Sequence, residues 1–543
     1  MTGRWGRLSN RDDVEVLSVG QVLERSARML PDKVAMIHED QRITFKETNE
    51  RADAMAAALQ SLGVTKGDRV AVSLQNIPEI AYTFFGITKL GAITAWANPA
   101  YREEEVEFIL RNSGAKVAIM HRELKGFDYL RMLGGMRSRL PDLQHVIMID
   151  PRPDDGVIDY RRFLEKHAGA AFYKPPIDIK KDYALFYNTG GTTGIPKAAA
   201  HTHYTAIMRA TVTIDDLELT ADDVTLALMP MFHPFGGAAS LVLPIATLGT
   251  IVLMPEYNAE KSLQLIQEHK VTIHHCAPAH ILMCTKLPNF KEYDVSSLRT
   301  GLAAGFRWPP EVFVRAYEEM NLDLVHIWGM AEIGGMALGC APNRDGRERR
   351  NIYMGRPYEG EAMVVDPDTR KPVPPGEPGE LVFRGEIFKE YWNNPVETAK
   401  AFDSEGWFYT GDMVTQNEEG YIKMVGRYKE QINRGGLKIE PGELENLLIK
   451  HPKVKEVCVI ATPNPVLGES ICACIVPMGE DRPTLKELRE YLQDKVAQYK
   501  LPEELAIFES FPRLAGGVKY KKFGEGSIQE MATKDETREK LRK

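Results

Sequence analysis

Cysteine is scarce in this sequence. The 543 residues include six cysteines, and no two of them form a CxxC pair. A small scaffold held together by disulfides and a zinc-binding module are therefore not indicated. Cys472 and Cys474 alternate in the apolar run ICACIVP, where residues two apart share one face of a strand, so we expect both to pack in a core. Reduced thiols fit the cytoplasm, which is the location we expect.

An excess of positive charge and long apolar runs are also missing. The formal net charge is -8 at pH 7, which leaves no broad basic surface for nucleic acid or anionic lipid. No segment reaches the roughly twenty apolar residues of a membrane span. The opening MTGRWGRLSNRDDVEV contains no apolar stretch for export. We therefore expect no nucleic acid partner and no membrane span, and any phosphate binding has to be local.

What the sequence does contain is an alternation of helical and strand patterns. Thr44 and Glu47 form a capping box that opens a helix running to Leu62, and Gly63 ends it. Further along, short apolar runs alternate with helical stretches, in the order 69–74, 77–90, 92–98, 103–111 and 116–120. This alternation predicts an α/β fold with a largely parallel sheet that is covered on both faces.

Length and punctuation predict two domains. Charged residues make up 27% and hydrophobic residues 43%, which suits large buried cores. Beyond Gly426 the alternation restarts on a smaller scale. We expect a large N-terminal domain of layered sheets and helices (1–426), and a small mobile α+β C-terminal domain (427–543). Gly426, Gly435 and Gly436 favour a hinge at the junction.

The strongest chemical signal is the segment NTGGTTGIPK, which follows an apolar strand at 183–187. Its glycines free the backbone to curl, its threonines supply hydroxyls and Lys197 supplies a cation, so the loop can wrap a triphosphate. A P-loop is excluded because Pro196 precedes the lysine and Ala198 follows it. A plain glycine-rich turn is the alternative. The candidate phosphate-binding residues are Thr189, Gly190, Gly191, Thr192, Thr193, Gly194 and Lys197.

Five motifs carry a resemblance to a known superfamily. They are YNTGGTTGIPKAAAHTH (187–203), PMFHPFGG (230–237), WGMAE (328–332), YTGD (409–412) and GRYKEQINRGGLKIEPGELE (426–445). In this order they resemble the acyl-CoA synthetases, luciferases and peptide-synthetase adenylation domains, and most of all the AMP-forming acyl-CoA ligases. The resemblance covers nearly the whole chain. It implies ATP, Mg2+ and coenzyme A as cofactors or co-substrates.

The resemblance also implies roles for polar residues in these motifs. Glu332 would hold Mg2+ against the ATP phosphates, since hard cations prefer oxygen ligands. Asp412 would accept hydrogen bonds from the ribose hydroxyls, and Arg427 would fix the same sugar. Ala331 stands where similar proteins usually have a threonine that meets a phosphate oxygen, so that contact is absent or supplied elsewhere.

The base and the acid have candidate residues by the same resemblance. The adenine pocket would include Gly305 and Phe306, with Trp328 as the stacking aromatic, although Trp328 could equally be a core residue. His233 would lie beside the carboxylate of the acid. No aspartate occupies that place to pair an ammonium group, and an unpaired buried charge is costly, so amino acids are disfavoured as substrates.

The C-terminal stretch FPRLAGGVKYKKF would supply a catalytic lysine that contacts the reacting carboxylate and the α-phosphate. Lys519 is the first candidate, although it falls one residue later than the family pattern. Lys521 and Lys522 stay open as alternatives, and a plain basic loop end would explain the stretch without catalysis. The flexible cation would stabilise the charge that accumulates on the transferring oxygens.

Two half-reactions are implied, with a rotation of the small domain between them. Lys429 lies at the hinge position of the family, and Gly435 and Gly436 would line the path of the pantetheine arm of coenzyme A, where a bare backbone leaves room. Both half-reactions would take place at a cleft between the two domains.

We therefore expect an ATP-dependent carboxylic acid–CoA ligase. Gly329 stands where similar acetate enzymes have a pocket-blocking tryptophan, and Gly334, Gly335 and Ala337 are small, so a medium-chain, alicyclic or aromatic acid is favoured. One alternative is an aryl or acyl-AMP ligase that loads a separate carrier protein. An alternative of another class is a nucleotide-binding regulatory protein without turnover. The expected partners are small molecules, and a homodimer is left open.

Overall fold

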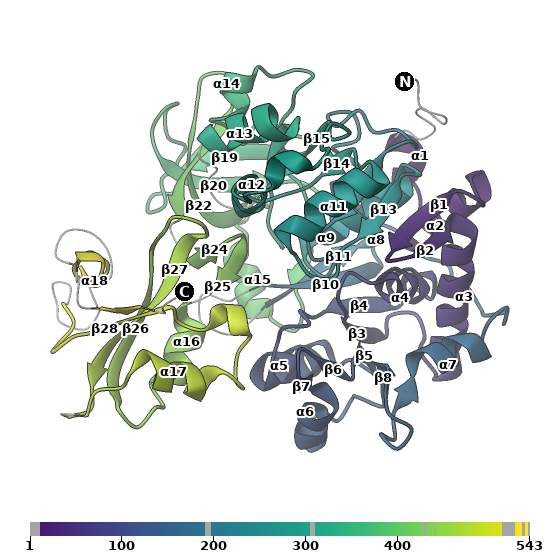
Figure 1. Cartoon of the computed structure of the whole chain (residues 1–543), viewed down its shortest axis with the longest axis horizontal. Helices are drawn as coiled ribbons and strands as arrows, with labels where there is room; N and C mark the ends of the chain where they lie inside the picture. Colours follow the sequence, from purple (N-terminus) through teal and green to yellow (C-terminus); the bar gives the residue numbers. More distant parts are fainter. Residues whose placement is uncertain are drawn as a thin grey trace. The chain divides into compact units, whose positions relative to one another are not determined.

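The computed structural model describes residues 11–189, 197–304, 310–427, 432–439, 441–479, 481–512, 527–534 and 538–540. The chain forms two compact units (Figure 1). The first contains the described residues of Met1–Pro99, Ile109–Thr189 and Ala198–Gly426. The second contains those of Ala100–Phe108, Gly190–Lys197 and Arg427–Lys543. Among the described helices, none combines the length and the apolar character needed to cross a bilayer.

The α/β fold that the sequence predicts is confirmed by two large, mostly parallel sheets. One has the strand order β21-β11-β10-β4-β3-β5-β8-β9. Its strands are β3 (Arg69–Ser73), β4 (Ile93–Trp96), β5 (Val117–His121), β8 (His145–Ile149), β9 (Ile158–Asp159), β10 (Tyr183–Thr189), β11 (Lys197–Thr202) and β21 (Glu390–Tyr391). Apart from the edge strand β21, which is antiparallel to β11, the paired strands whose register is known run parallel.

The second large sheet has the order β18-β17-β16-β15-β14-β12-β13-β1-β2. Its strands are β1 (Val34–His38), β2 (Gln41–Thr44), β12 (Val224–Ala227), β13 (Thr250–Leu253), β14 (Ile273–His274), β15 (Thr300–Ala303), β16 (Asp323–Trp328), β17 (Leu338–Cys340) and β18 (Arg356–Pro357). A smaller antiparallel sheet contains β19 (Glu361–Val365), β20 (Gly379–Arg384), β22 (Phe408–Gln416) and β23 (Ile422–Arg427).

Helices lie between these strands in the chain. They are α1 (Arg11–Glu15), α2 (Val19–Met29), α3 (Phe45–Ser61), α4 (Pro78–Lys89), α5 (Glu103–Ser113), α6 (Tyr129–Met136), α7 (Tyr160–Lys166), α8 (His203–Thr211), α9 (Pro234–Gly236), α10 (Leu243–Ala246), α11 (Ala259–His269), α12 (Pro278–Thr285), α13 (Pro310–Met320), α14 (Arg347–Arg350) and α15 (Pro395–Ala401). The predicted capping box opens α3: Glu47 N–H donates to Thr44 Oγ1 at 3.1 Å, and Thr44 N–H donates back to the glutamate at 2.7 Å.

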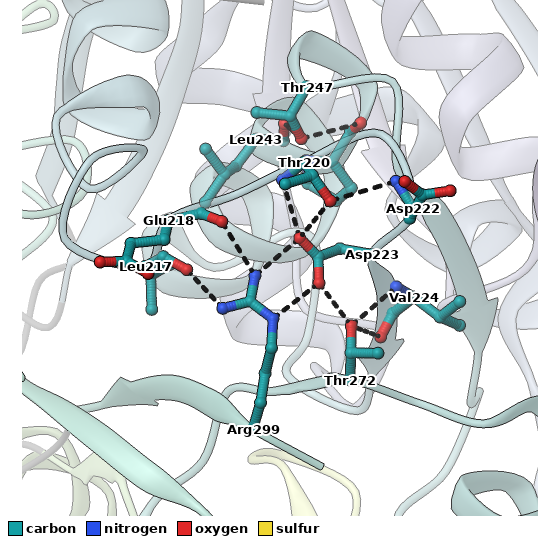
Figure 2. A network of polar contacts seen from close by, with 11 residues as sticks. Leu217, Glu218, Thr220, Asp222, Asp223, Val224, Leu243, Thr247, Thr272 and Arg299 are labelled. Atoms are coloured by element: carbon teal, nitrogen blue, oxygen red, sulfur yellow. Dashed lines mark hydrogen bonds and ion pairs between the residues drawn. The ribbon is translucent and has the colours of Figure 1, made fainter. Parts of the chain in front are cut away.

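A polar network ties together the starts of three neighbouring strands in the nine-stranded sheet (Figure 2). Asp223, Thr272 and Arg299 each stand directly before a strand, β12, β14 and β15 respectively. The guanidinium of Arg299 donates to both oxygens of Asp223, at 2.7 and 2.9 Å, and to the carbonyl of Leu217 at 2.7 Å. Thr272 Oγ1 donates to the same carboxylate at 2.7 Å. Hydrogen bonds between side chains therefore fill the amino ends of these strands. In an open α/β sheet, ligands bind at the carboxyl ends.

The second unit is a small α+β structure, as the sequence predicts. It contains β24 (Ile432–Arg434), β25 (Leu437–Ile439), β26 (Val454–Asn464), β27 (Gly468–Pro477), β28 (Glu504–Ile507) and β29 (Glu539–Lys540), with α16 (Pro441–Leu448), α17 (Leu485–Leu492) and α18 (Ile528–Lys534). Leucines of α16 and α17 pack on one face of the long hairpin β26–β27, and α18 packs on the other (Figure 1). Cys472 and Cys474 are buried on the α18 side, which confirms their expected place in a core.

Candidate functional site

The carboxyl ends of the parallel strands in the nine-stranded sheet carry several of the predicted residues. Strand β16 ends at Trp328, and Glu332 follows four residues later. Strand β12 is followed by the segment that contains His233. Because parallel strands end at the same edge of a sheet, the fold collects these motifs on one side. In an open α/β sheet this edge is where ligands bind.

Glu332 is held by a segment near residue 390. Its side chain is buried, and its Oε1 accepts a hydrogen bond from the hydroxyl of Tyr391 at 2.8 Å. Its backbone carbonyl accepts from Phe388 N–H at 2.9 Å. Within the described part of the chain, the carboxylate has no ion-pair partner. A buried carboxylate without a cation beside it is costly, so a cation from solution would bind it favourably.

The loop between Trp328 and Gly335 is tightly packed. A Cβ atom on Gly329 would lie 1.9 Å from the carbonyl oxygen of Gly335. Gly334 has a φ of 83°, and a Cβ there would lie 2.7 Å from the imidazole of His201. The backbone of the loop therefore gives a packing reason for glycine at position 329, beside the expected link to the size of the acid.

His201 of β11 holds the same loop. Its Nε2 is bonded to the carbonyl of Ala331 at 2.7 Å. Burial lowers the pKa of His201 to about 3, so the imidazole is neutral at physiological pH and its Nε2 donates the hydrogen bond. Ala331 thus contributes its backbone carbonyl to the packing of the loop.

Trp328 and Asp412 contact each other. The indole Nε1–H donates to Asp412 Oδ2 at 2.8 Å, and both residues are buried. Asp412 lies on β22, where its N–H donates to Thr410 Oγ1 at 3.1 Å. The ring of Trp328 belongs to a core cluster and is 4% exposed. The structure thus joins two predicted nucleotide-binding residues and gives Trp328 a structural role beside the expected one.

His233 caps the short helix α9. Its Nδ1 accepts a hydrogen bond from Phe235 N–H at 3.3 Å. His233 is half-buried. The hydrogen bond at Nδ1 gives this histidine a structural role at the start of α9.

Gly435 and Gly436 form the turn of the hairpin between β24 and β25. Their φ angles are 60° and 94°, in the left-handed region, and Gly436 N–H donates to Asn433 Oδ1 at 2.9 Å. A two-residue hairpin turn of type I′ requires positive φ at both positions, which glycine adopts without strain. The turn therefore explains why both positions are glycine, independently of any contact with coenzyme A.

The structure describes only some of the remaining predicted residues. Thr189 ends β10 and Lys197 begins β11, and Arg427 ends β23 with its side chain outside the described residues. The other predicted residues lie outside the described residues altogether: Gly190, Gly191, Thr192, Thr193, Gly194, Gly305, Phe306, Lys429 and Lys519, together with the alternatives Lys521 and Lys522. Their roles stay predictions.

Tyr391 is a polar partner in the site that sequence reasoning missed. The stretch EYWNNP carries no signal that would connect it to Glu332, since 59 residues separate the two. The contact depends on the pairing of β21 with β11, which is a long-range feature of the sheet.

Two family models match the sequence. One, described as AMP-binding enzyme, covers residues 23–392, and the other, described as AMP-binding enzyme C-terminal domain, covers residues 443–517. The chain belongs to the AMP-binding enzyme family. The resemblance inferred from the five motifs is thereby confirmed.

Relatives of this AMP-binding enzyme are similar to it over nearly its whole length. A human protein named medium-chain acyl-CoA ligase ACSF2, mitochondrial, is 31% identical, with 93% of this chain and 86% of the relative covered. The crystal structure of the anthranilate CoA ligase AuaEII in complex with anthranoyl-AMP has a TM-score of 0.72 at 28% identity, covering 93% and 95%. A Mycobacterium tuberculosis fatty acyl CoA synthetase has a TM-score of 0.68 at 27% identity, covering 96% and 99%.

Proposed function

We propose that this AMP-binding enzyme is an ATP-dependent acid–CoA ligase that forms AMP. The observation that carries the proposal is the similarity to the human medium-chain acyl-CoA ligase across 93% of this chain. The two family models also occur in the order that such a ligase needs, with the larger one first. The substrates are then a carboxylic acid, ATP and coenzyme A.

The reaction has two steps. In the first, a carboxylate oxygen attacks the α-phosphorus of ATP and the bond to pyrophosphate breaks, which gives an acyl adenylate. In the second, the thiol of coenzyme A attacks the acyl carbon, AMP leaves and the thiol proton passes to solvent. Negative charge builds up on the phosphoryl oxygens, and we assign Lys197 and Lys519 to stabilise it.

Mg2+ fits the carboxylate of Glu332. The side chain is buried and without an ion-pair partner in the described residues, and a magnesium ion needs one or two carboxylates beside ATP phosphates and water. When bound, the ion would neutralise phosphate charge and orient the triphosphate. Glu332 itself would hold the ion at the carboxyl end of β16.

Asp412 is the proposed ligand of the ribose. A carboxylate can accept several hydrogen bonds, which suits the two hydroxyls of a ribose, and the indole of Trp328 already donates to Oδ2. We propose that Trp328 orients Asp412 through its indole N–H, in addition to packing near the adenine. Arg427 would fix the same sugar.

The proposed acid is medium-chain, alicyclic or aromatic. The relatives named above include a medium-chain acyl-CoA ligase and an anthranilate CoA ligase. His233 would lie beside the carboxylate of the acid. We propose a cytoplasmic location, which the six buried free cysteines support.

Pyrophosphate exchange into ATP over a panel of carboxylic acids tests the proposal, with coenzyme A added to the acids that respond. We expect exchange with octanoate, cyclohexanecarboxylate or benzoate, little with acetate, and a thioester once coenzyme A is present. Adenylate formation without acceleration by coenzyme A would favour a ligase that loads a carrier protein. No exchange with any acid would contradict enzymatic turnover.

A further inference from the structure

Tyr391 and Glu332 form a buried pair that the reaction scheme above does not use. The tyrosine is 5% exposed and the glutamate 7% exposed. The hydroxyl of Tyr391 is the donor and the carboxylate oxygen of Glu332 is the acceptor, at 2.8 Å. A hydrogen bond to a carboxylate is stronger than one between two neutral groups.

The position of Tyr391 is itself fixed by its surroundings. On β21 it lies opposite Ala199 of β11, and its N–H donates to Thr398 Oγ1 at 3.0 Å. Its ring contacts the ring of Phe388 with centroids 4.8 Å apart. A donor held on a strand and against a neighbouring ring can fix the orientation of a flexible glutamate side chain. The side chain then loses less rotamer freedom when it binds a ligand.

The same short segment controls both ends of Glu332. Phe388 N–H binds the backbone carbonyl of the glutamate, and the Tyr391 hydroxyl binds its side chain. Strand β11, to which this segment is paired, begins at Lys197, the last residue of the predicted phosphate-binding loop. The segment thus connects the proposed metal ligand with the strand that leaves that loop.

We propose that Tyr391 is a positioning residue that holds the Glu332 carboxylate in the orientation required to bind Mg2+ with ATP. This inference rests on the proposed role of Glu332 as the magnesium ligand. The hydrogen bond occupies one of the acceptor positions on Oε1, and the carboxylate keeps the others for the ion. Groups that orient a metal ligand in this way typically change metal affinity or activity about 10- to 100-fold when they are removed.

Tyr391→Phe tests the role, because it removes one oxygen and keeps the ring. The half-saturating Mg2+ concentration for ATP–pyrophosphate exchange should rise roughly tenfold, while kcat at saturating Mg2+ is largely retained. A direct readout is Mn2+ binding in the presence of α,β-methylene-ATP, followed by electron paramagnetic resonance. The apparent Kd for Mn2+ should rise by a similar factor.

A matched control removes a hydrogen bond from Glu390, the neighbour of Tyr391 on β21. Tyr183 donates its hydroxyl to Glu390 at 2.9 Å, so Tyr183→Phe removes the same kind of bond from the residue next to Tyr391. It should leave the Mg2+ dependence unchanged. Thr398→Val, which loosens the backbone of Tyr391, should raise the half-saturating Mg2+ concentration severalfold and serves if Tyr391→Phe does not fold.

Glu332→Gln separates this inference from the proposal on which it rests. If Tyr391 acts through the glutamate, Tyr391→Phe should add little to the loss already caused by Glu332→Gln. A large effect of Glu332→Gln with unchanged Mn2+ and Mg2+ affinity in Tyr391→Phe would overturn the role of Tyr391 alone. Unchanged metal binding in Glu332→Gln would overturn the assignment of the metal ligand, and the role of Tyr391 with it.

Discussion

At the scale of single residues, the loop that carries Glu332 is determined by close backbone contacts. The carbonyl oxygen of Gly335 occupies the position that a Cβ atom on Gly329 would need, at 1.9 Å. His201 binds the carbonyl of Ala331, and Phe388 and Tyr391 bind Glu332. The orientation of the glutamate is thus set by its neighbours, so substitutions beside it should affect the reaction with every acid alike.

Gly329→Ala tests this reading. The added methyl group meets backbone, which cannot give way as a flexible side chain can, so the loop has to shift and overpacking costs about 1–3 kcal/mol. We expect ATP–pyrophosphate exchange to fall at least tenfold with large and small acids alike. Gly134→Ala, where a Cβ meets nothing within 4 Å, is the control and should be nearly neutral. A gain of preference for acetate without loss of overall rate would show that Gly329 lines the acyl pocket after all.

At the scale of elements, local signals in the sequence predicted far more than long-range ones. The capping box of Thr44 and Glu47 predicted the start of α3, because both residues lie in one turn. Short apolar runs predicted the parallel strands, because each run lies within a few consecutive residues. The pairing of β21 with β11 joins Tyr391 to Ala199, and no local pattern specifies such a contact. The approach of the Gly335 carbonyl to Gly329 could not be predicted either, because no sequence pattern specifies the path of the loop.

The network around Asp223 makes a prediction about elements, since it joins the starts of β12, β14 and β15 (Figure 2). Arg299→Met removes the cation that pairs this buried carboxylate. With part of the arginine exposed, we expect a loss of about 2 kcal/mol in the free energy of unfolding and a melting temperature several degrees lower.

Arg315→Met is the control for this substitution, because the Arg315–Glu319 pair lies on the exposed surface of α13, where an ion pair contributes about 0.3–0.5 kcal/mol. Exchange activity of Arg299→Met at low temperature should persist, since the network stands at the amino ends of strands and Glu332 follows a carboxyl end. Equal melting temperatures for the two variants would mean that the network does not hold these strands together.

The whole molecule consists of two compact units, and the proposed reaction uses residues from both parts of the sequence. The first unit contains Glu332, His233, Trp328 and Asp412, and the sequence places Lys519 in the C-terminal part of the chain. The family membership of both parts was predictable, because the five motifs are spread along nearly the entire sequence. The identity of the acid was not, because the pocket that selects it depends on side chains from distant segments.

The central claim is that the carboxylate of the acid becomes bonded to the α-phosphorus of ATP. Turnover of an acid labelled with 18O in its carboxylate, with ATP, Mg2+ and coenzyme A, tests it by mass spectrometry of the products. We expect one 18O atom in AMP, because the attacking oxygen stays with phosphorus when the thiol takes the acyl group. Label in phosphate or pyrophosphate, or AMP without label, would contradict it.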